Sequence, residues 1–82
     1  MVVEGGRVGR EWNAERLVDV LRERVLGGIH TGRLDTGDRL PSYREVTEQT
    51  GVTDLRTVAR AYAVLEREGL VEVRGRSGVF VA

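Results

Sequence analysis

Apolar side chains recur at a helical spacing along the first third of the chain. They fall on one face of a helix with 3.6 residues per turn, and the charged residues between them fall on the other face. The apolar set is Ala14, Leu17, Val18, Leu21, Val25 and Ile29. Asn13 is a favourable N-cap, and Trp12 and Leu17 are spaced as a hydrophobic staple. The pattern predicts a helix that starts near Asn13, stops by Gly32 and buries this face.

End signals predict a second, short helix. Ser42 and Glu45 form a capping box directly after Pro41, and Gly51 is a natural stop. We therefore expect a helix from about Tyr43 to Thr50, with Val46 buried.

A third helix is predicted by its apolar spacing. Val58, Ala61, Tyr62 and Leu65 lie at i, i+3, i+4 and i+7. Thr53 or Asp54 caps this helix, and Gly69 ends it, with Leu70 placed to touch Leu65.

The C-terminal residues change to a strand pattern. Residues 71–73 and 79–81 are β-branched runs joined by Arg74, Gly75, Arg76, Ser77 and Gly78, which predicts a hairpin with a basic tip. Arg39 and Leu40 are a candidate short strand. Residues 1–11 show no period and are expected to form a flexible tail. The predicted organisation is a tail at 1–11 and one domain at 12–82, mainly α with a small β-hairpin: a winged helix-turn-helix.

Composition limits the function classes. A chain of 82 residues forms one small domain of marginal stability, so a partner subunit or an attached domain is expected. With no Cys and one His, neither a disulfide nor a Cys- or His-based metal site can form, and we expect no metal or cofactor. No apolar run reaches the roughly 20 residues of a membrane span, and no signal peptide opens the chain, so the expected location is the cytoplasm.

The net charge gives no support to a nucleic-acid partner, because 13 basic and 13 acidic residues cancel. The positions of the charges do support such a partner. Arg56, Arg60 and Arg67 project opposite Val58 on the third predicted helix. Such a stripe suits contacts to guanine or phosphate. The competing interpretation is that these arginines are solvated or paired with neighbouring glutamates; we prefer it for Arg67, and prefer DNA contact for Arg56 and Arg60.

Two further segments are candidate contacts. Arg44 lies in the first turn of the second helix, where a cation opposes the helix dipole at a small cost that a DNA contact would offset. Ser42 is first a capping residue, and the free N–H groups beside it could hold a phosphate. Arg74, Gly75, Arg76 and Ser77 form a wing that could enter a minor groove, or equally a generic turn with solvated charges; we favour the wing.

In this order of parts the chain resembles the N-terminal domain of the GntR family of bacterial transcription regulators. Four stretches carry the resemblance: residues 37–46 (GDRLPSYREV), 57–62 (TVARAY), 65–71 (LEREGLV) and 75–81 (GRSGVFV). The second stretch looks most like the YtrA-like and MocR-like branches. The match covers about residues 13–82.

The resemblance implies a homodimeric regulator that binds a palindromic operator in double-stranded DNA, with the third helix in the major groove and the wing on the adjacent groove. It also implies that Arg44 contacts DNA and that Thr57 binds a phosphate, although a helix-surface threonine bonding to its own backbone is a competing role for Thr57. Family members carry a C-terminal effector-sensing or dimerisation domain, which we do not find in this chain. Between Val52 and Thr57 the family usually has three residues and this chain has four, and we expect the turn to absorb the extra one.

Two other functions compete with DNA binding. A winged-helix module that docks other proteins without binding DNA suits the neutral charge, but such a surface would carry aromatic or Met anchors beside the arginine stripe, and none is there. An enzyme is not expected, because no nucleophile has an adjacent base and no catalytic group of residues can be named.

Overall fold

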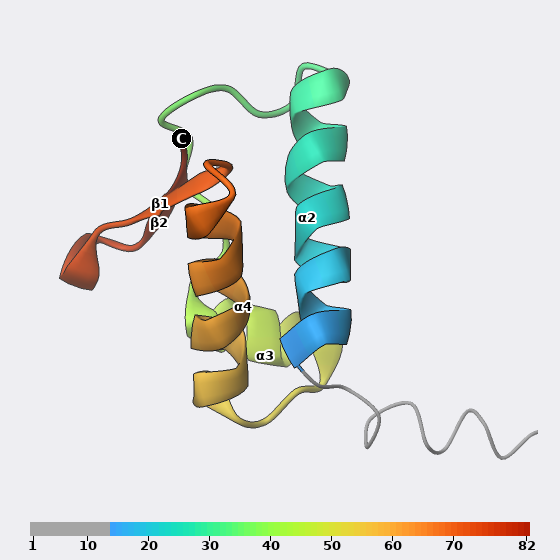
Figure 1. The fold of residues 1–82 in the computed structure, drawn as a ribbon, viewed down its shortest axis with the longest axis vertical. Helices are drawn as coiled ribbons and strands as arrows, with labels where there is room; N and C mark the ends of the chain where they lie inside the picture. Colours follow the sequence, from blue (N-terminus) through green and yellow to red (C-terminus); the bar gives the residue numbers. More distant parts are fainter. Residues whose placement is uncertain (1–13) are drawn as a thin grey trace, which may run out of the picture.

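The computed structural model describes residues 14–82. The predicted tail, the predicted cap Asn13 and the staple residue Trp12 lie outside the described residues. The described elements are helix α2 (Ala14–His30), helix α3 (Tyr43–Thr50), helix α4 (Leu55–Arg67), strand β1 (Val71–Val73), the 3₁₀ turn η2 (Gly75–Ser77) and strand β2 (Val79–Val81). Three helices followed by an antiparallel hairpin make a winged helix-turn-helix, as predicted (Figure 1).

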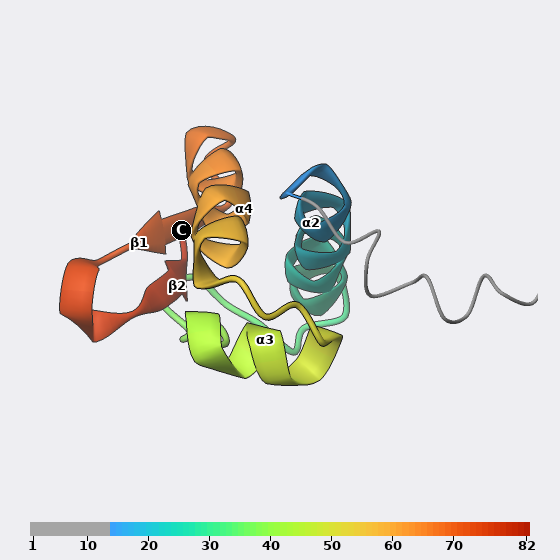
Figure 2. The ribbon, with the colours of Figure 1, turned by 90° about the horizontal axis from the view of Figure 1, so that it is seen from below.

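Helix α2 packs beside α4, and α3 crosses beneath both of them (Figures 1 and 2). Its apolar face is buried at Leu17, Val18, Leu21 and Val25. Ile29 was expected on this face, but 43% of it is exposed, so that prediction is wrong. The physical reason is that α2 extends past the end of α4, and its last turn has no helix to cover it (Figure 1).

Helix α3 has the predicted bounds because its ends are set locally. The Ser42 hydroxyl accepts a hydrogen bond from the Glu45 backbone N–H at 3.1 Å, and the Glu45 carboxylate accepts one from the Ser42 N–H at 2.8 Å. Gly51 ends the helix with φ of 82°, a backbone conformation that residues with a side chain rarely adopt. Val46 is fully buried, which ties this short helix to the core.

Helix α4 is capped by Asp54, whose carboxylate accepts a hydrogen bond from the Arg56 N–H at 2.9 Å. Thr53 and Asp54 therefore precede the helix and lie in the turn, where the sequence placed the extra residue. At the other end Gly69 has φ of 82°, and the Leu70 N–H reaches the Leu65 carbonyl at 3.0 Å, which is the predicted Schellman ending.

The core lies where the three helices and the hairpin meet. Val58, Ala61, Tyr62 and Leu65 of α4 are at most 1% exposed. The remaining buried apolar residues come from the turn, the connection and the strands: Leu40, Val52, Val71, Val79 and Val81. Helix α4 is thus enclosed on its apolar face and open on the opposite one.

The hairpin is anchored by a third segment. Strand β1 pairs with β2 in the register Val71 to Val81 and Val73 to Val79. On the other edge of β2, the connection before α3 forms one bridge from Arg39 to Phe80, with the Leu40 N–H donating to the Val79 carbonyl at 2.8 Å. The candidate strand at Arg39 and Leu40 is therefore a single bridge, and it fixes the start of α3 beside the wing.

Candidate nucleic-acid interface

The start of α3, the start of α4 and the wing meet on one face of the molecule. In Figure 2 the N-terminal end of α4 points toward the viewer, with α3 below it and the hairpin to the left. An open groove of about 310 Å³ lies between these parts. The groove residues are Arg39, Ser42, Tyr43, Arg44, Leu55, Val73, Gly75, Arg76, Gly78 and Val79. They come from three stretches of the sequence: residues 39–44, Leu55 and residues 73–79.

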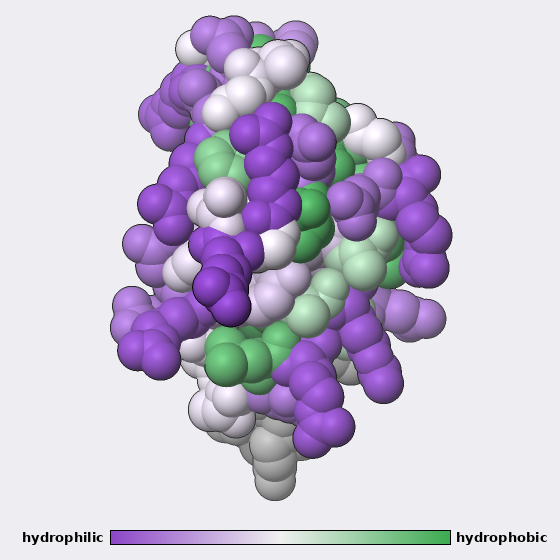
Figure 3. All heavy atoms as spheres, turned by 90° about the vertical axis from the view of Figure 1, so that its left-hand side faces the viewer, coloured by the Kyte–Doolittle hydropathy of each residue, from purple (hydrophilic) through white to green (hydrophobic). Residues whose placement is uncertain are grey.

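The groove is cationic although the chain as a whole is neutral. Arg39, Arg44 and Arg76 line it, and no acidic residue of the described chain does. None of these three guanidinium groups hydrogen bonds or ion pairs with a residue among 14–82. Figure 3 shows this wing-bearing face, where hydrophilic side chains project around smaller apolar areas. Three uncompensated charges beside a helix N-terminus are suited to bind phosphate groups.

Arg56 and Arg60 lie on the outward face of α4. Both are exposed, and neither has a side-chain partner within the described residues. The competing interpretation, pairing with Glu66 or Glu68, does not occur: Glu66 accepts the Val73 N–H at 3.0 Å and Glu68 binds Arg22. Neither of them lines the groove; both add exposed cations to α4, the helix whose first residue, Leu55, does line it.

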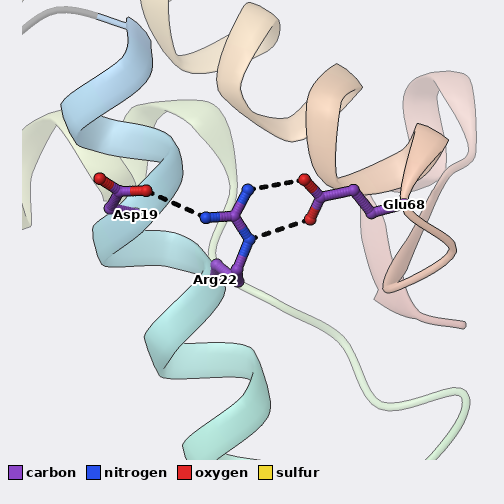
Figure 4. Close-up of polar contacts among 3 residues, drawn as sticks. All are labelled: Asp19, Arg22 and Glu68. Atoms are coloured by element: carbon purple, nitrogen blue, oxygen red, sulfur yellow. Dashed lines mark hydrogen bonds and ion pairs between the residues drawn. The ribbon is translucent and has the colours of Figure 1, made fainter.

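The end of α4 is held against α2 by an ion pair. Arg22 donates through two nitrogens to the two carboxylate oxygens of Glu68, at 3.0 and 2.6 Å, and through the third to Asp19 at 3.0 Å (Figure 4). The hydrogen bonds that Arg22 donates to Glu68 lower the pKa of Glu68 and raise the pKa of Arg22. This cluster orients α4 from the end opposite the groove.

The two wing arginines differ in their surroundings. Arg74 pairs with Glu72 at 2.9 Å, and its guanidinium carbon lies 4.5 Å from the centre of the Phe80 ring, so it folds back on the hairpin. Arg76 lines the groove instead. Gly75 at the tip has φ of 48°, which permits the tight turn between them, and Ser77 beside it is exposed.

The hydroxyl groups of Ser42 and Thr57 differ in their hydrogen bonding. The Ser42 hydroxyl is engaged in the capping box, so its cap role is observed. Thr57 is half-buried, and its hydroxyl makes no hydrogen bond to residues 14–82, which leaves the hydroxyl available to another acceptor. The self-bonding alternative is not the arrangement found.

Arg39 is the groove arginine that sequence reasoning missed. Its guanidinium lies over Gly78, where an added Cβ would come within 3.4 Å of the Arg39 Nε. The sequence held a signal, because an apolar residue such as Leu40 is expected to face the core and is buried in the structure. Neighbours in an extended segment face opposite sides, so Arg39 faces outward. Which surface it would join depended on the bridge to Phe80.

Neither a membrane-spanning helix nor a metal cluster is seen in the part of the chain that the structure describes. None of its helices combines the length and apolar character needed to cross a bilayer. No three of its His, Asp or Glu side chains gather as metal ligands would.

Comparison with known proteins identifies relatives along almost the whole chain. Residues 13–81 match the model of the bacterial regulatory proteins of the gntR family. The HTH-type transcriptional regulator Rv1152 of Mycobacterium tuberculosis is 47% identical over 66 residues, which cover 80% of this chain and 54% of that protein. The HTH-type transcriptional repressor YtrA of Bacillus subtilis is 38% identical over 69 residues, or 83% of this chain and 48% of that one. The chain thus spans about half the length of these two relatives.

Solved structures give the same result. YtrA from Sulfolobus acidocaldarius, described as a GntR-family transcription factor, superposes with a TM-score of 0.61 at 33% identity, over 84% of this chain and 53% of that one. The DNA-binding domain of AraR, solved in complex with operator ORE1, has a TM-score of 0.67 at 26% identity, over 79% of this chain and 78% of that one.

Proposed function

Since the chain belongs to the gntR family of bacterial regulatory proteins, we propose that it binds operator DNA in a sequence-specific way and serves a transcription regulator. The observation that carries this proposal is the cationic groove at the starts of α3 and α4. Arg56 and Arg60 add two exposed cations on α4. The relatives are named transcriptional regulators, which supports a binding role over catalysis. Action on the chromosome would place the protein in the bacterial cytoplasm.

In this proposal the N-terminal end of α4 enters the major groove, as recognition helices of helix-turn-helix proteins do. Arg56 and Arg60 read guanine, whose O6 and N7 accept both hydrogen bonds of a guanidinium. Arg44, with Arg39, contacts the backbone beside the start of α3, and Ser42 and Thr57 support phosphate contacts.

The wing of Arg74, Gly75, Arg76 and Ser77 lies on the adjacent groove. Arg76 is free to reach a phosphate or the minor groove, because nothing in residues 14–82 pairs with it. Arg74 would have to leave Glu72 to make the same contact, so we assign the larger share of wing affinity to Arg76.

A homodimer on a palindromic operator is part of the proposal. A small domain gains stability from a partner, and two identical copies on a two-fold site double the number of contacts. A protein-docking module is less favoured, because the groove residues are mostly cationic or small and an operator complex is known for the similar AraR domain.

The test measures affinity for operator DNA selected in vitro by the 82-residue chain, at about 50 and 200 mM salt. Arg60→Ala is expected to lose about 1–3 kcal/mol, or roughly 5- to 160-fold in Kd, and to relax the preference at one base pair. Arg67→Ala is the matched control: it removes the same charge from the same helix at the end away from the groove, and its Kd should change much less. Weak, salt-independent binding to every sequence would refute the proposal.

A further inference from the structure

Leu55 is an exposed leucine on the proposed DNA face. It is 48% exposed, and the other exposed large apolar residues of the described chain, Leu26 and Ile29, both lie on α2. Leu55 is the first residue of α4 and lines the cationic groove together with Arg44 and Arg76. An apolar side chain thus stands where the surrounding groups are suited to bind DNA.

The fold does not account for leucine at this position. The apolar face of α4 is filled by Val58, Ala61, Tyr62 and Leu65, which are at most 1% exposed. The helix start is already capped by Asp54, and polar or acidic residues favour a first turn more than leucine does. Half of the Leu55 surface meets solvent in the free protein, so a partner that covered it would gain hydrophobic stabilisation.

The major groove of DNA offers one apolar partner. Among the base edges displayed there, only thymine carries a methyl group, and apolar side chains contact it. Leu55 precedes Arg56, and Ala59 lies one turn further along the helix with too small a side chain to block close approach. A thymine methyl next to a guanine would therefore face Leu55 while Arg56 or Arg60 reads the guanine.

We infer that Leu55 is a specificity-determining residue that selects thymine in the operator by contact with its 5-methyl group. This inference rests on the proposed DNA binding and extends it to one base. A protein or an apolar small molecule covering Leu55 would be a different occupant, and the test below separates them.

The test removes the methyl group from the DNA rather than from the protein. In the operator selected by the 82-residue chain, each thymine is replaced in turn by deoxyuridine, which pairs identically but lacks the methyl. For the wild-type protein we expect about a fourfold loss of affinity for the methyl that Leu55 covers, the transfer free energy of one buried methyl or methylene group expressed as a Kd ratio. The other thymines should show little change.

The second half of the test changes the protein: Leu55→Ala is combined with the same thymine and deoxyuridine operators. This variant should bind the thymine and deoxyuridine operators equally, and selection repeated with it should relax the preference at that base pair alone. Leu26→Ala is the matched control, since it shortens a leucine of similar exposure (46%) that does not line the groove. Because Leu55 is half exposed, the melting temperature of Leu55→Ala should stay close to that of the wild type, which shows that the variant is folded.

The outcomes separate the two proposals. Salt-sensitive binding that needs Arg60 but ignores every thymine methyl would overturn the role of Leu55 and leave DNA binding intact. A fourfold methyl effect that persists unchanged in Leu55→Ala would also overturn it. A chain that selects no DNA sequence at all would overturn the proposed function and this inference together.

Discussion

Tyr62→Phe tests the bond that joins the two helices of the proposed interface. Tyr62 is 1% exposed in the core, and its hydroxyl donates a hydrogen bond to the Pro41 carbonyl at 2.8 Å, just before α3 begins. Its ring stacks on Tyr43 with centroids 5.9 Å apart. Burial raises the pKa of Tyr62, so the hydroxyl stays protonated and remains a donor throughout the physiological range.

The expected loss of stability depends on which interactions of Tyr62 are removed by Phe and which are kept. The ring and its packing are kept, so no cavity term enters beyond one oxygen atom. A typical hydrogen bond contributes about 0.5–1.5 kcal/mol net, and an acceptor left buried without a partner costs up to about 3 kcal/mol. Pro41 is only half-buried, so water can reach its carbonyl and the lower range applies. We expect a loss of about 1 kcal/mol, which lowers the Tm of a domain of this size by about 4–8 °C.

Thermal and urea unfolding followed by circular dichroism measure this loss. Tyr43→Phe is the matched control, because it removes a hydroxyl from the other ring of the stacked pair, and the Tyr43 hydroxyl has no hydrogen bond to residues 14–82. Its stability should stay within about 0.5 kcal/mol of the wild type. Equal losses for the two variants, or no loss for Tyr62→Phe, would show that the bond to Pro41 does not hold α3 against α4.

Two further predictions concern acidic residues. Arg22 lowers the pKa of Glu68, so the contribution of this pair to stability is complete above the unfolded pKa near 4.3 and is lost as pH falls through the lower folded pKa. The stability gap between wild type and Glu68→Gln should therefore narrow below about pH 4; an identical gap at pH 3 and pH 7 would contradict this. Asp54→Asn keeps a good N-cap but removes a negative charge at the start of α4, so operator affinity should rise at low salt and the gain should fade at high salt, as binding titrations would show. Weaker binding at low salt would mean that Asp54 does not face DNA.

Local signals predicted most of the fold. The capping box set the start of α3, Gly51 set its end, and Gly69 set the end of α4, because each depends on residues within one turn. The prediction for Ile29 failed because helical periodicity says which side of a helix is apolar, while burial depends on what covers that side. Helix α2 is longer than its partner, and no local pattern shows where a neighbouring helix stops.

Local patterns also predicted only part of the interface, because the rest depends on contacts between residues far apart in the sequence. Helical geometry alone places Arg56 and Arg60 on one outward face. Arg39 and Arg76 line the same groove because of the bridge between Arg39 and Phe80, two residues that are far apart in the sequence. The folding back of Arg74 onto Phe80 also needs the strand register, since Glu72 lies opposite Phe80 across the hairpin.

The arrangement of charges explains how a neutral chain can present a cationic face. Many carboxylates of the described chain accept hydrogen bonds from other residues of the chain. Asp38, Glu45 and Asp54 accept from backbone N–H groups in the connection and at the helix starts, Glu66 accepts from β1, and Asp19, Glu68 and Glu72 pair with arginines. The groove arginines have no such partners among residues 14–82. Net charge therefore measures long-range attraction to DNA, which should be weak here, whereas affinity depends on the few guanidinium groups at the contact. A regulator built this way would depend more on close contacts than on electrostatic attraction from a distance. Removing Arg56, Arg60 or one groove arginine should therefore cost more specific affinity than removing an arginine elsewhere on the surface.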